Sequence, residues 1–102
     1  MSDHIWPTRG MWSTLPYCLD ESLRGHHHLF DAQLVRRSFE PFEVDPAAVA
    51  GAQELLAELR REEDLAAQRE RIACAPEPAQ RLFVRIYFDY LAAFERGVRV
   101  AH

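Results

Sequence analysis

Three consecutive histidines are the residues of this chain best suited to chemistry. They occupy positions 26–28, and Asp31 follows at helical spacing from His27 and His28. Residues three and four apart lie on neighbouring turns of a helix, so these imidazole and carboxylate groups could approach one another. Cys18 could join them from the preceding segment, and zinc accepts all three ligand types. His27, His28, Asp31 and Cys18 are therefore a candidate metal site, with a transition metal such as zinc as its cofactor.

The same residues have a simpler structural interpretation. His27 shares a helical stripe with Leu23, Phe30 and Leu34, which is compatible with the edge of an apolar core or with a pH-sensitive interface. The chain contains no CxxC or HExxH motif, no nucleophile motif and no glycine-rich phosphate loop. We therefore expect no catalytic residue and no cofactor, and we keep the metal site as the alternative.

Six prolines divide the chain into the segments that would position these residues. Residues 1–19 contain two of them and lack a helical period, which predicts an extended N-terminal arm. Residues 20–38 carry two apolar stripes at helical spacing and are expected to form the first helix. The expected division is thus an arm, 1–19, and a helical domain, 20–102.

Two further helices are expected after this one. The Asp-Pro pair at 45–46 is a strong helix start, and residues 47–73 have a helix-forming composition. Their apolar seam is lost across the charged run 60–64, so the helix either kinks there or turns its second half toward a different neighbour, and we expect one long helix. The last helix is expected over 78–96, with Gly97 as a left-handed stop residue. The predicted fold is all-α: a three-helix bundle, or four helices if the middle one breaks, with an aromatic N-terminal arm.

The last helix carries the strongest signal for binding. Its apolar residues cover an arc of about 240° at 100° per residue, whereas a surface helix normally shows a stripe of about 100° or a little more. Either the arm and the other helices cover this arc, or part of it is an interface with a second copy or another protein. The arm is rich in Trp and Tyr, which are common in binding hot spots. The candidate partner-binding residues are Trp6, Trp12, Phe83, Tyr87, Phe88, Tyr90 and Phe94.

Composition excludes several classes of partner. The 102 residues carry a formal charge of −4, which argues against nucleic acid as the main partner. No apolar run is long enough to span a membrane, and no signal peptide is visible, so we expect a cytoplasmic protein with reduced cysteines. All 12 basic residues are Arg, and Asn is absent, which is typical of a high-GC, bacterial genome.

The sequence therefore favours a small non-enzymatic accessory or adaptor protein. It would act through protein–protein contacts, made by the apolar C-terminal helix and the aromatic arm, with a dimer as the commonest form of self-association. The alternative is a small metal- or cofactor-binding helical protein that uses the His26–His28 and Asp31 cluster.

Overall fold

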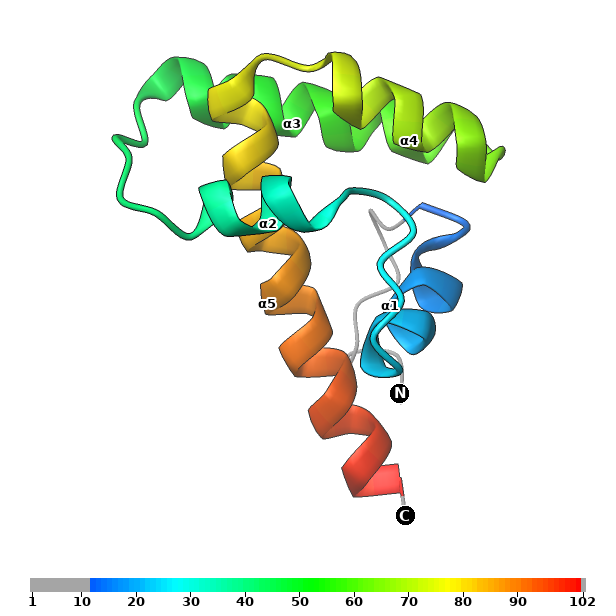
Figure 1. Ribbon diagram of the computed structural model, residues 1–102. Coiled ribbons are helices and arrows are strands. Elements are labelled where there is room, and N and C mark those ends of the chain that lie inside the picture. Colours follow the sequence, from blue (N-terminus) through cyan, green and yellow to red (C-terminus); the bar gives the residue numbers. More distant parts are fainter. Residues whose placement is uncertain (1–11, 102) are drawn as a thin grey trace.

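The regular structure of this chain is helical throughout the part that the structure describes. The computed structural model describes residues 12–101, and side chains as far as Gly97. The all-α prediction is confirmed, but these residues form five helices where three were expected (Figure 1). They are α1 (Leu15–Leu23), α2 (Ala32–Ser38), α3 (Pro46–Arg61), α4 (Leu65–Cys74) and α5 (Glu77–Ala101).

The long helix α5 is the axis of the fold. Helices α1, α2 and α3 each pack against it, and α4 runs back along α3 (Figure 1). Helices α3 and α4 lie across one end of α5, whose C-terminal part extends beyond the other helices. Apolar side chains from all five helices or their connections meet in one core, because burial removes them from water. The larger members of this core are Trp12, Leu15, Leu19, Leu29, Phe30, Leu55, Leu59, Ile72, Phe83 and Tyr87.

Small residues set the close approach of α3 to α5. Ala48 and Ala52 are buried on α3, and Ala79 is buried on α5. Gly51 lies between Ala48 and Ala52 along α3. A Cβ atom built on Gly51 would be 2.9 Å from the Cβ of Ala79. The two backbones can therefore cross closely only because position 51 has no side chain.

The prediction of an extended arm over residues 1–19 is wrong from Leu15 onward. Helix α1 begins there, and Pro16 stands in its first turn. Proline favours the first turn of a helix, since its fixed φ is helical and its missing N–H would have no partner within the helix. Trp12, just before α1, is buried in the core. Residues 1–11, including Trp6, lie outside the described residues.

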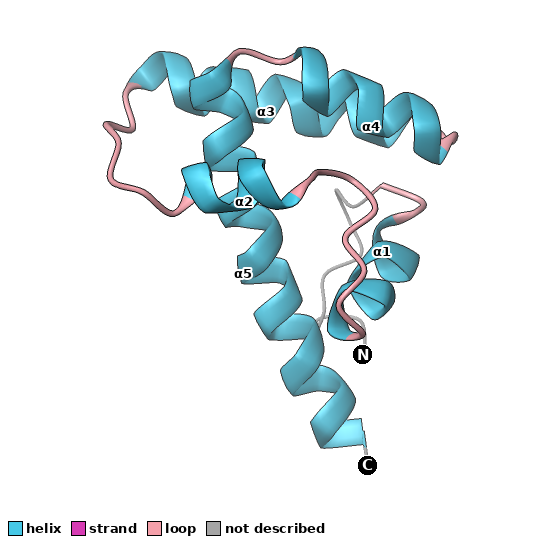
Figure 2. Cartoon of the chain, in the orientation of Figure 1, coloured by secondary structure: helices cyan, strands magenta, loops and turns pink. Residues whose placement is uncertain are grey.

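The expected first helix, 20–38, is two short helices with a loop between them (Figure 2). Gly25 takes a φ of +91°, a left-handed conformation that ends α1. The chain then remains non-helical until Asp31, whose carboxylate accepts a hydrogen bond from the backbone N–H of Leu34 and caps α2. The three histidines therefore lie in a loop and not on a helix.

The expectation of one long middle helix is wrong, because the chain leaves the helix at residues 62–64, where the apolar seam is lost. Asp64 caps α4 by accepting from the N–H of Ala67. Gln68 is fully buried, and its amide donates to the carbonyls of Leu59 and Glu62, which closes the end of α3. The predicted start of α3 is confirmed, because Asp45 caps it and Pro46 occupies its first turn.

The last helix is longer than expected. It runs from Glu77 to Ala101, so Gly97 does not stop it. A glycine ends a helix only where it takes a positive φ, and Gly25 is the one glycine among the described residues that does.

Candidate functional site

A chain of buried and partly buried hydrogen bonds joins the histidine loop to α5. The hydroxyl of Tyr87 lies 3.0 Å from the carbonyl oxygen of Cys18 and 2.6 Å from Ser22 Oγ. Ser22 Oγ lies 2.8 Å from His27 Nδ1. Burial raises the pKa of Tyr87 to about 12, so this phenol keeps its proton.

The carbonyl at the end of this chain fixes the direction of every bond in it. A carbonyl can only accept, so Tyr87 donates to Cys18, and Ser22 must donate to the oxygen of Tyr87. Ser22 then has no second proton, and His27 must donate to it through Nδ1–H. His27 therefore orients the hydroxyl of Ser22 and cannot accept its proton at Nδ1, which is the opposite of a serine–histidine catalytic pair.

The other two histidines turn toward a different group. His28 Nε2 lies 3.3 Å and His26 Nδ1 3.5 Å from the same oxygen of Glu21, while Arg24 donates to the other oxygen of that carboxylate. The hydrogen bond from His28 is the main reason that the pKa of Glu21 is lowered. Tyr17 stacks on His28 at 5.4 Å between ring centroids. This group ties the start of the loop back onto α1.

The structure does not bring the candidate metal ligands together. Cys18 is buried on α1, and burial raises the pKa of its thiol. Asp31 is used as the cap of α2, His27 donates to Ser22, and His28 faces Glu21. Within residues 12–97 no group of three or more His, Cys, Asp or Glu side chains could hold a metal ion.

The partner-binding candidates divide into a buried and a half-buried set. Phe83 and Tyr87 are fully buried, and Trp12 packs on Phe83 with 5.8 Å between ring centroids. These three side chains belong to the core and have no surface left for a partner. The half-buried candidates are Phe88, Tyr90 and Phe94, which pack against the core from the later turns of α5.

The indole nitrogen of Trp12 is an exception to the general satisfaction of buried polar groups. It is the one buried side-chain nitrogen or oxygen without a hydrogen-bond partner in the part of the chain that the structure describes. An unmatched buried donor usually destabilises a fold by about 1–3 kcal/mol. The apolar contact of this ring with the core must therefore outweigh that penalty.

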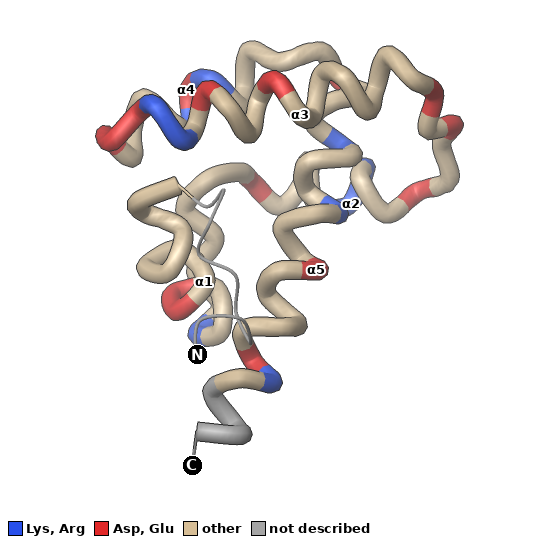
Figure 3. The backbone as a smooth tube through the Cα atoms, turned by 180° about the vertical axis from the view of Figure 1, so that it is seen from behind, with Lys and Arg blue, Asp and Glu red and all other residues tan. Residues whose placement is uncertain are grey.

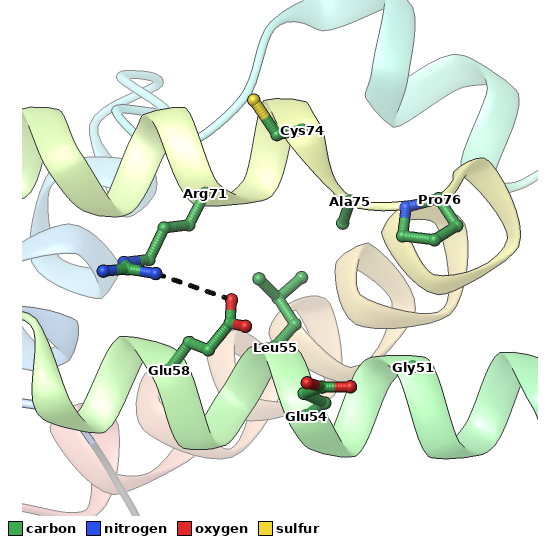
Figure 4. A pocket seen from close by; sticks show the side chains of 8 residues that line it. All are labelled: Gly51, Glu54, Leu55, Glu58, Arg71, Cys74, Ala75 and Pro76. Atoms are coloured by element: carbon green, nitrogen blue, oxygen red, sulfur yellow. Dashed lines mark ion pairs between the residues drawn. The ribbon is translucent and has the colours of Figure 1, made fainter.

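A crevice lies between α3 and α4 (Figure 4). Its volume is about 370 Å³, Leu55 forms part of its floor, and Glu58 faces Arg71 across it at 3.9 Å. Cys74 lies on its edge, but its thiol donates to Glu70, and this bond raises its pKa. Nucleophilic cysteines need a lowered pKa, so this crevice does not present an activated thiol.

The pairing of Ser22 with Tyr87 was not predicted from the sequence. The two residues are 65 positions apart, and neither belongs to a recognisable motif. Only the packing of α1 on α5 brings them together.

No described helix combines the length and the apolar character needed to cross a membrane. Comparison with protein-family models, with curated proteins and with solved structures finds no match to this chain.

Proposed function

We propose that this chain is a small non-enzymatic accessory or adaptor protein that acts through protein–protein contacts along α5. Its partner would be a second copy of the chain, a larger protein, or both, and neither nucleic acid nor a membrane is part of the proposal. Residues 1–11, the part of the expected arm that carries Trp6, would contribute to the same contacts.

The observation that carries this proposal is the mismatch between apolar pattern and burial on α5. Phe83 and Tyr87 are fully buried, and the same helical stripe continues through Leu91 to Phe94. Beyond Tyr87, however, every described apolar side chain of this stripe is only partly buried. In Figure 1 the C-terminal end of α5 extends past the other helices. An apolar stripe that outlasts the core is typical of a surface that packs on something else.

The rest of the molecule supports a binding role over catalysis. The hydrogen bond between Ser22 and His27 has its proton on the imidazole, which is the wrong order for nucleophile activation, and the raised pKa values of both cysteines make them poor nucleophiles. The metal-binding alternative receives no support from the positions of its ligands. We therefore propose that the protein functions without a resident metal.

The proposal is tested by comparing two substitutions on adjacent positions of α5. Leu91→Glu places a charge on the half-buried stripe, while Ala92→Glu places the same charge on an exposed position. We expect wild-type protein to form a dimer at high micromolar concentration or to retain a stoichiometric partner when purified from its source cells. Leu91→Glu should abolish that association, and Ala92→Glu should preserve it.

Light scattering and co-purification decide the outcome, and thermal melting verifies that both variants remain folded. A monomer without a partner contradicts the proposal. Equal loss of association in both variants contradicts the assignment to this stripe. Stoichiometric metal in untagged protein, lost when His26 and His28 are replaced by Gln, would favour the metal-binding alternative.

A further inference from the structure

The half-buried end of the α5 stripe lies within a short distance of the first described residue. Trp12 is 2% exposed and packs on Phe83, with 5.8 Å between ring centroids. The N–H of Leu15 donates to the carbonyl of Trp12 at 3.1 Å, which joins this anchor to the start of α1. Residues 1–11 are therefore attached to the molecule beside Phe83, in the first half of α5.

The described chain covers one half-buried ring of α5 but leaves exposed surface at the end of the stripe. His27 packs on Phe88 with 5.5 Å between ring centroids. Leu91 and Phe94 follow about one and two turns later, where they pack on the edge of the core and are only partly buried. Figure 3 shows that residues 90–94 form an uncharged stretch of this helix. A segment that covers this stretch must therefore be apolar and close to neutral.

Residues 1–11 have the composition that such a cover requires. They contain Ile5 and Trp6, and the charges of Asp3 and Arg9 cancel. Trp6 is the largest of these side chains, and an aromatic side chain of this kind buries about 150–250 Å² of surface. The segment can thus offer a large apolar group without adding net charge.

The spacing of Trp6 from Trp12 matches the spacing of the stripe from Phe83. Trp6 is six positions before Trp12, and a chain spans at most about 3.3–3.6 Å per residue, or about 20 Å in all. Along α5, Leu91 is eight and Phe94 eleven positions beyond Phe83. At a rise of about 1.5 Å per residue, these positions lie about 12 and about 17 Å away. Trp6 can therefore reach both side chains while Trp12 stays against Phe83.

The attachment at Trp12 favours the α5 of the same chain over the α5 of a second copy. Two groups joined by a short linker meet at an effective concentration of the order of millimolar when the linker spans the distance between them. That concentration exceeds the high micromolar range in which we expect the protein to associate with itself. The segment therefore meets its own helix first.

We propose that residues 1–11 pack on the end of the α5 stripe in their own chain, with Trp6 against Leu91 and Phe94. This inference rests on the proposed function in taking the stripe as the binding surface. It deepens that function by naming what covers the stripe before a partner arrives. A partner would then bind a composite surface, built from α5 and this segment together.

Thermal melting of the full chain at low micromolar concentration tests this packing through a double-mutant cycle. Trp6→Ala should lower Tm by at least about 4 °C in the wild-type background. In the Phe94→Ala background it should lower Tm by less than half as much, because its contact is already lost. Tyr17→Ala is the matched control, since this ring is 53% exposed on α1, and its effect should add to that of Trp6→Ala. In NMR spectra of the wild type, the ring protons of Trp6 should show nuclear Overhauser effects to the methyl groups of Leu91.

Three results would overturn the packing of this segment on α5. They are an unchanged Tm in Trp6→Ala, an equal effect of that substitution with and without Phe94, and Trp6 ring protons that show no Overhauser effect to Leu91. A coupling between Trp6 and Phe94 that appears only as the protein concentration rises would place the segment on a second copy, and would also overturn it.

The outcome can be separated from that of the proposed function. If Trp6 couples to Phe94 while the wild type stays a monomer without a partner, the proposed function fails and the packing remains. If Trp6 does not couple to Phe94 while Leu91→Glu abolishes association, the proposed function stands and the packing is wrong.

Discussion

The crossing of α3 over α5 makes Gly51 the most informative position for substitution. In an ordinary helix interior, Gly→Ala stabilises by about 1 kcal/mol, because alanine loses less backbone entropy on folding. At position 51 the new methyl group would lie 2.9 Å from the Cβ of Ala79. Neither atom can rotate away, because each is attached directly to a helix backbone. The two helices must therefore separate.

The two effects can be compared. Forcing extra volume into a packed core typically costs about 1–3 kcal/mol, which exceeds the propensity gain. We expect Gly51→Ala to lower the free energy of unfolding by about 1 kcal/mol and Tm by about 4–8 °C. Gly97→Ala is the matched control, since it lies in the same kind of helix with no atom within 4 Å of the added methyl group. That variant should gain up to about 1 kcal/mol.

Urea unfolding of four proteins completes this test. They are wild type, Gly51→Ala, Ala79→Gly and the double variant. Removal of the Ala79 methyl group should relieve the clash, so the double variant should be more stable than the sum of the single effects predicts, by about 1–2 kcal/mol. Gly51→Ala protein that is as stable as Gly97→Ala, or strictly additive effects, would refute the role assigned to this crossing.

Three further predictions concern the caps and the buried polar chain. Tyr87→Phe should lower the free energy of unfolding by about 1–3 kcal/mol in urea titrations, because Ser22 and a buried carbonyl lose their partner; an unchanged midpoint would contradict the stabilising role of these two bonds. Burial lowers the pKa of His27 below its ordinary 6.5, so the stabilisation from the neutral ring is fully present above about pH 6.5 and is lost as pH falls through the lowered pKa. His27→Gln should flatten that part of a pH–stability curve, and an identical slope in both proteins would exclude His27 as its source. Asp64→Ala should destabilise by about 1 kcal/mol through loss of the α4 cap, measured against the neighbouring exposed Glu63→Ala, which should have little effect.

Local signals in the sequence predicted the helical class and one helix start well. The Asp45-Pro46 pair specified the beginning of α3 because capping depends only on neighbouring residues. The charged run 60–64 interrupts the apolar periodicity where the buried face changes, but one long helix was expected there and the chain forms α3 and α4. The errors arose where one residue type is compatible with two kinds of local structure. Pro16 was interpreted as favouring extended structure, and it stands in the first turn of a helix.

The arrangement of side chains could not be predicted, because it depends on contacts between distant segments. The histidine run suggested ligands on one helical face, but Gly25 turns the chain and sends His27 and His28 to different partners. The hydrogen bonds from Arg81 and Arg85 to carbonyls at the end of α2 form only because α2 and α5 meet, although more than forty positions separate the bonded residues. Among the predicted binding residues, the sequence could not distinguish the side chains that are buried in the core from those that keep some exposed surface. Phe83 and Tyr87 fill the core, whereas Phe88 and Phe94 lie farther along α5 and are half-buried.

The position of α5 in the order of the chain has a consequence for biosynthesis. Helices α1, α2 and α3 all pack on α5, which is the last of the five to be translated. Apolar residues such as Trp12, Leu15 and Leu19 therefore have no core to join until Phe83 and Tyr87 have left the ribosome. At about 5–20 residues per second, the nascent chain spends several seconds with this surface open to chaperones and to other chains. Folding of this core therefore waits until α5 has emerged, and slower elongation would lengthen the interval in which the chain can aggregate.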